Sequence, residues 1–157
     1  MSEDYEDFLR SKQVRARAAG FEPGPVPSLL FDWQGDVVRW TVRQGRAAIF
    51  AGCGLGKTGM QLAWADQVAR HTQRPVLVLT PLAVAPQTVE EATKFGMEAR
   101  IVARQSEVPS GPSICVTNYQ KLLKNHFDPE AFGDPVADSE RGSHVRLLRR
   151  WRRRPSG

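Results

Sequence analysis

The chain has 157 residues, a length typical of one domain, and 41% hydrophobic residues, enough for a core. An acidic start, Met1–Asp7, excludes a secretory signal, and no apolar run is long enough to cross a membrane, so a cytoplasmic protein is expected. Cys53 and Cys115 exclude a disulfide framework. The net charge of +5 belongs to the C-terminal end: residues 141–157 hold seven arginines and no acid, whereas residues 1–140 hold 15 basic and 17 acidic residues.

The first third of the chain predicts two helices, a linker and a strand. Residues 4–18 predict a polar, solvent-exposed helix, and the proline-rich stretch 20–27 predicts a linker. Residues 32–44 have helical spacing. One face of that helix holds Trp33, Val37, Trp40 and Thr41. The apolar run 46–50 predicts a strand.

The most informative segment is Ala51-Gly52-Cys53-Gly54-Leu55-Gly56-Lys57-Thr58, which follows the predicted strand and precedes a helical pattern over about residues 57–71. Strand, glycine-rich loop and helix form the context of a phosphate-binding P-loop. Glycines let backbone N–H groups converge on phosphate oxygens, and the helix N-terminus adds partial positive charge. We expect Lys57 to reach the β- and γ-phosphates and the Thr58 hydroxyl to hold Mg²⁺. The usual pattern begins with Gly, where this chain has Ala51.

The rest of the chain alternates strand and helix signals. The continuous apolar run 75–80 predicts a buried parallel strand. A helix is predicted over 86–95, short strands over 99–103 and 113–117, and a helical turn or two over 119–124. This order predicts an α/β fold, with a mostly parallel sheet, helices on both faces and ligands at the carboxyl ends of the strands.

Several segments together resemble the first RecA-like lobe of superfamily-two helicases, most closely the Swi/Snf-like DEAD/DEAH-box helicases of phages and prophages. Leu30-Phe31-Asp32-Trp33-Gln34 resembles the glutamine motif, in which the amide of Gln34 would read the adenine edge. The loop resembles motif I, where this family tolerates Ala at the first position. The resemblance covers roughly residues 28–133 and implies a partial, incomplete RecA-like lobe that binds ATP and Mg²⁺. Residues 1–27 would then be an N-terminal helix and linker, and residues 134–157 a divergent, disordered tail.

Two further segments resemble the family's nucleic-acid contacts. Residues 80–87 are similar to motif Ia, and residues 117–119 are similar to motif Ib. The resemblance implies that DNA is contacted at strand ends, where hydroxyls and backbone N–H groups hold phosphates without reading sequence. The residues at these positions are Thr80, Pro81, Thr117 and Asn118. Each segment alone also fits an ordinary turn after a strand, so their order and spacing carry the interpretation.

The resemblance breaks after residue 133. The family's next strand ends in Asp-Glu, where the Asp binds Mg²⁺ through water and the Glu positions the attacking water. Here Asp138 falls at the first position and Ser139 at the second, while Asp134 and Pro135 disfavour a central strand. An arginine-rich end of this kind is typical of a shifted reading frame of GC-rich DNA. We hypothesise that the sequence from about Asp134 is out of frame and lacks motif II and the second lobe, so that nucleotide binding without hydrolysis or translocation is expected.

Two alternatives to a helicase lobe remain open. Another P-loop enzyme, such as a kinase, would share residues 51–58 but has no use for the segments around Gln34 and Thr80. A binding module would use the tail from Arg141 to Arg154, with His144 and Trp151, to hold RNA or DNA by phosphate contacts and stacking. Deleting residues 141–157 separates binding by the tail from binding by the helicase surface.

Overall fold

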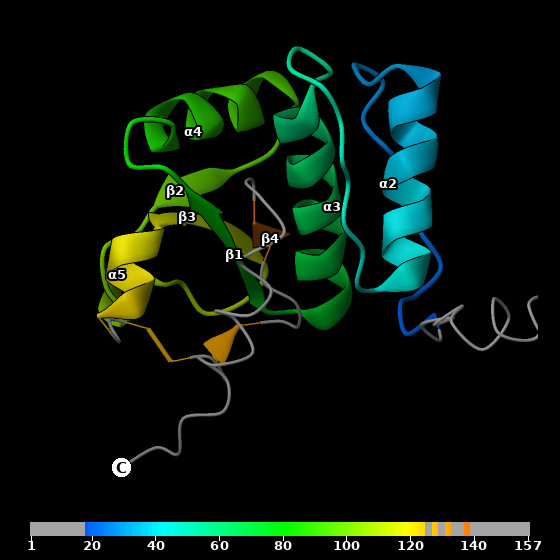
Figure 1. Ribbon diagram of the computed structural model, residues 1–157. Coiled ribbons are helices and arrows are strands. Elements are labelled where there is room, and N and C mark those ends of the chain that lie inside the picture. The colour runs from blue at the N-terminus through cyan, green and yellow to red at the C-terminus, as the bar shows by residue number, and fades with distance from the viewer. Residues whose placement is uncertain (1–17, 125–126, 129–130, 133–136, 139–157) are drawn as a thin grey trace, which may run out of the picture.

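The computed structural model describes residues 18–124, 127–128, 131–132 and 137–138. These residues form a parallel four-stranded sheet with strand order β2-β3-β1-β4 and helices on both faces, which confirms the predicted α/β class (Figure 1). The strands are β1 (Pro75–Thr80), β2 (Ala99–Ile101), β3 (Ser113–Asn118) and β4 (Ala137–Asp138). Residues 4–17 of the helix predicted over 4–18, Ser139 and the arginine-rich tail lie outside the described residues.

The helices begin and end close to their predicted bounds. The helices are α2 (Asp32–Gln44), α3 (Lys57–Thr72), α4 (Ala85–Lys94) and α5 (Tyr119–Leu123), and a 3-10 turn, η1, spans Gln105–Glu107. Strand β2 is shorter than the predicted strand over 99–103, because the chain turns toward η1 after Ile101.

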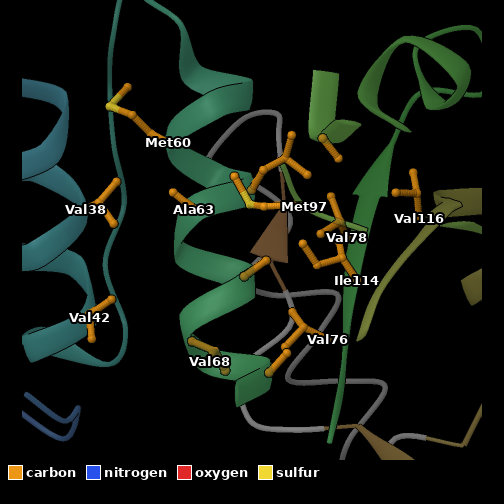
Figure 2. Packing of buried hydrophobic residues seen from close by; sticks show 14 of the residues in the cluster. Val38, Val42, Met60, Ala63, Val68, Val76, Val78, Met97, Ile114 and Val116 are labelled. Carbon is orange, nitrogen blue, oxygen red and sulfur yellow. The ribbon is translucent and has the colours of Figure 1, made fainter. Parts of the chain in front are cut away.

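Strand β1 explains the two-layered core. All six of its residues are buried, because its alternating side chains enter two different apolar clusters. Val76 and Val78 face α3, together with Ile114 of β3 (Figure 2). Leu77 and Leu79 belong to the other cluster, which includes Leu122 of α5. Burial of each such aliphatic side chain contributes about 1.5–3 kcal/mol to stability.

Helix α2 packs against α3, on the side of α3 away from β1 (Figure 2). Its buried residues are Gln34, Gly35, Val38, Thr41 and Val42, so Thr41 is the only member of the predicted face with Trp33, Val37 and Trp40 that is buried. Gly35 lets the segment before α2 approach the helix closely, since a Cβ there would lie 3.2 Å from the Val26 side chain. The indoles of Trp33 and Trp40 are 44% and 49% exposed.

The stretch predicted as a linker is bound along the C-terminal end of α2. The backbone N–H of Gly20 donates to the carbonyl of Arg43 at 3.1 Å, and Phe21 donates to Val42 at 3.3 Å. The ring of Phe21 also stacks on His71 of α3, with ring centroids 3.8 Å apart. These contacts tie the residues before α2 to both helices.

The strand predicted over 46–50 is wrong. These residues form no secondary structure and are exposed, with the Phe50 side chain 87% accessible. An extended segment becomes a strand only when a neighbour supplies hydrogen bonds for its backbone. Among the described residues, the sheet runs from β2 to β4 and offers no strand that pairs with this segment.

Candidate nucleotide-binding site

The loop over residues 51–56 leads directly into the N-terminus of the 16-residue helix α3. Gly54 (φ 78°) and Gly56 (φ 66°) both have left-handed backbone conformations, which L side chains rarely adopt. Gly56 is the N-cap, no side chain caps the helix, and its first turn contains no acidic residue. The first backbone N–H groups of α3 and its dipole are therefore available to an anion.

The ammonium group of Lys57 is held over the loop. Its Nζ donates to the carbonyl oxygens of Ala51, at 3.1 Å, and Gly52, at 2.8 Å. An ammonium has three N–H donors, so a phosphate oxygen can be bound in addition to these carbonyls or in exchange for them. Lys57 therefore connects the two ends of the loop through hydrogen bonds and places a positive charge beside the exposed glycines.

Gln34 connects α2 to this loop. Its amide is buried: Oε1 accepts from the backbone N–H of Phe31 at 2.9 Å, and Nε2 donates to the carbonyl of Leu55 at 3.1 Å. The same Nε2 lies 2.5 Å from the position that a Cβ on Gly56 would occupy. Burial of an amide is tolerated only when its polar atoms are paired, so these bonds fix the distance between the glutamine segment and the loop.

The four residues predicted to contact DNA come together at the carboxyl ends of β1 and β3, where Thr80 pairs in register with Asn118. The hydroxyls of Thr80 and Thr117 are buried and have no hydrogen-bond partner. Asn118 caps α5, because its Oδ1 accepts from the backbone N–H of Lys121 at 3.0 Å. Pro81 is half-buried and is the one member of the set that reaches the surface of the described sheet edge.

A family model described as "Type III restriction enzyme, res subunit" (ResIII) matches residues 14–144. The chain belongs to this family. The matched region is a helicase-type N-terminal RecA-like domain, and at family level such domains bind ATP with Mg²⁺, hydrolyse it and act on DNA. No curated protein matches the chain. Within the described ranges, no helix has the length and apolar character needed to cross a membrane.

Two residues of this ResIII-family chain, Thr58 and Asp138, offer oxygen atoms of the kind that bind Mg²⁺. Thr58 is half-buried in the first turn of α3 and offers a hydroxyl oxygen. Asp138 ends β4, and its backbone is in register with Leu79 near the carboxyl end of β1. Mg²⁺ is usually held by one or two protein oxygens plus phosphates and water, a donor set that these residues fit. The described residues contain no cluster of three or more His, Cys, Asp or Glu.

Sequence reasoning missed Phe31. It is the N-cap of α2, its side chain is 70% exposed, and its backbone is bonded to the Gln34 amide that contacts the loop. The signal available in the sequence was an aromatic residue directly before the helical pattern of residues 32–44.

The two cysteines have opposite environments. Cys53 lies in the loop and is exposed, whereas Cys115 is buried in β3. Burial raises the pKa of the Cys115 thiol, an effect that the neighbouring Ser113 hydroxyl and Arg100 only partly offset. Cys53 is therefore the thiol that can report on the state of the loop.

Proposed function

We propose that this chain binds a nucleoside triphosphate with Mg²⁺ through residues 51–58, as the nucleotide-binding part of an ATP-driven enzyme that moves on DNA. One observation carries the proposal: two left-handed glycines lead into an uncapped helix N-terminus that lacks acidic residues and has Lys57 over it. Each part favours an anion, and together they match the backbone, dipole and charge that phosphates require. The Thr58 hydroxyl would hold Mg²⁺ beside the terminal phosphates.

We propose that the adenine base of the nucleotide binds at the start of α2. Gln34 has an amide that can donate and accept, but both of its polar atoms are engaged with Phe31 and Leu55. Reading of an adenine edge would therefore exchange one of these bonds for a bond to the base. The exposed Phe31 ring offers a flat apolar surface for the base in the same region.

Hydrolysis is proposed to be absent. Asp138 stands at the position of the metal-binding Asp, and the register with β1 supports that assignment. Ser139 follows where the family has a Glu. A serine hydroxyl cannot take the proton of the attacking water at neutral pH, so Ser139 would supply no base for hydrolysis at this position.

The proposed substrate is DNA, and the proposed relatives are the Swi/Snf-like helicases of phages and prophages. Both proposals rest on the segments at residues 30–34, 80–87 and 117–119. With the Thr80 and Thr117 hydroxyls buried, phosphate contacts at this edge would come from the backbone around Pro81. Such contacts position a strand without reading its sequence.

Thiol protection tests nucleotide binding without relying on turnover. In native protein, a chromogenic disulfide reagent is expected to react quickly with Cys53 and to reach Cys115 only on unfolding, so Cys115 serves as an internal control. ATP with Mg²⁺ should slow the reaction of Cys53 by about tenfold or more at saturation, because phosphates cover the loop.

Lys57→Ala should abolish that protection. The matched control is Arg70→Ala, which removes a cation from the far end of the same helix, where Arg70 forms an exposed ion pair with Asp66 at 2.9 Å. Arg70→Ala should leave protection intact. If ATP with Mg²⁺ fails to protect Cys53, or protects the Lys57→Ala variant equally, the loop is not the nucleotide site.

A further inference from the structure

The outer face of α2 carries an apolar stripe of Trp33, Val37 and Trp40. Both tryptophans are nearly half exposed, and Val37 is half-buried. With 3.6 residues per turn, the three side chains fall within about 60° of arc and extend over about 10 Å of the helix. Contiguous exposed aromatic surface of this kind marks an interaction site more often than isolated apolar residues do.

Charged residues line one flank of this stripe, with the acidic residues at one end of the helix and the basic residues at the other. Asp32 and Asp36 lie toward the N-terminus of α2, and Arg39 and Arg43 lie toward its C-terminus. Their spacing of four, three and four residues keeps all four on the same side of the stripe. The acidic half and the basic half of the flank are therefore displaced along the helix axis.

We propose that the stripe is the contact of a symmetric dimer, in which α2 packs antiparallel against α2 of a second copy of this chain. A twofold axis perpendicular to two antiparallel helices keeps their equivalent flanks on the same side and reverses their direction. Asp32 and Asp36 of one copy then face Arg43 and Arg39 of the other. Trp33 of each copy lies beside Trp40 of its neighbour, with Val37 near the centre.

The charge order selects this arrangement over the alternatives. In a parallel pair the charged flanks would lie on opposite sides of the interface and could not meet. The existing ion pairs, Arg39 with Asp36 and Arg43 with Glu22, are both 2.9 Å long and largely exposed. Exposed pairs are weak, so these arginines can share a carboxylate from the second copy at little cost. A contact of one helix per copy predicts a small interface and a reversible dimer.

Sedimentation velocity of the full chain over a wide concentration range tests the dimer. The wild type should show a concentration-dependent monomer–dimer equilibrium. Trp40→Lys should raise the dissociation constant at least about tenfold, because the substitution occurs twice in a symmetric interface. Leu82→Lys is the matched control, since Leu82 is also an exposed apolar side chain but lies between β1 and α4. Thermal unfolding monitors that each variant is folded.

Charge reversal tests the orientation. Asp32→Arg alone should weaken the dimer, Arg43→Glu alone should weaken it similarly, and the two together should restore the wild-type dissociation constant. A monomeric wild type at every concentration overturns the proposal and assigns the stripe to a different partner, such as another part of the ATP-driven enzyme. A dimer that survives Trp40→Lys, or one that the double reversal does not restore, also overturns it. None of these outcomes depends on nucleotide binding, which the protection of Cys53 measures separately.

Discussion

Gly56→Ala tests how tightly the glutamine segment is coupled to the loop. Both Gly56 and Gly54 have left-handed backbones, so alanine at either position costs about 1–2 kcal/mol of strain. The neighbours differ: a Cβ at Gly56 would meet Gln34 Nε2 at 2.5 Å, whereas a Cβ at Gly54 would meet nothing within 4 Å. Relief of that contact must move the Gln34 amide and break its bond to Leu55.

The magnitudes follow from these contacts. A displaced, buried amide loses about 1–2 kcal/mol, because a hydrogen bond is lost and its partners are left unpaired. Gly56→Ala should therefore lower the free energy of unfolding by about 2–4 kcal/mol, and Gly54→Ala by about 1–2 kcal/mol. The gain from restricting the unfolded chain is the same for both substitutions and cancels in the comparison.

Urea denaturation of the single and double variants measures the coupling. In a Gln34→Ala background the amide is gone, so Gly56→Ala should cost no more than Gly54→Ala. The Gln34 and Gly56 substitutions should then be non-additive by about 1–2 kcal/mol, while Gln34 and Gly54 should be additive within about 0.5 kcal/mol. Equal costs for the two glycine substitutions in the wild-type background would refute the reasoning.

Two further predictions concern packing and pH. Gly59→Ala should not gain the usual ~1 kcal/mol of helix propensity, because its Cβ would lie 2.8 Å from the Phe95 ring. In a Phe95→Leu background the same substitution should raise the free energy of unfolding, measured by urea denaturation, by about 1 kcal/mol. A full gain in stability with Phe95 present would contradict this prediction. The pKa of Glu107 lies below its ordinary value because the Ala103 backbone N–H and the Arg104 guanidinium donate to it. A lowered carboxylate pKa contributes stability above the unfolded-state value and loses it as the pH falls through the folded-state value. Glu107→Gln should therefore show a smaller drop in melting temperature than the wild type between about pH 6 and about pH 3, and an unchanged drop would argue against this role.

The sequence was sufficient to predict an element where residues adjacent in the chain determine its structure. The run 75–80 is apolar at every position except Thr80 and is rich in β-branched and aliphatic residues, as expected of a short strand covered on both faces, and β1 has those bounds. The loop over 51–58 and the helix that follows were likewise predictable, because glycines, a lysine and a helical pattern stand next to one another. The lengths of α3 and α4 follow from the same local periodicity.

Predictions failed where the outcome depended on a distant partner. Residues 46–50 read as a strand, but a strand needs a neighbour, and no described strand lies beside them. The helical spacing of residues 32–44 placed Trp33, Val37, Trp40 and Thr41 on one face but did not show which face is buried. The contact of α2 with α3 buries the side of Val38 and Val42.

The amino-acid sequence by itself thus determined the order of helices and strands from α3 onward and the position of the glycine-rich loop, because these depend on residues adjacent in the chain. Only the tertiary structure decided which side of α2 is buried, that Gln34 bonds Leu55, and that the Thr80 hydroxyl is enclosed. Those features depend on contacts between segments far apart in sequence, and burial forces each polar group either to find its partner there or to remain unpaired.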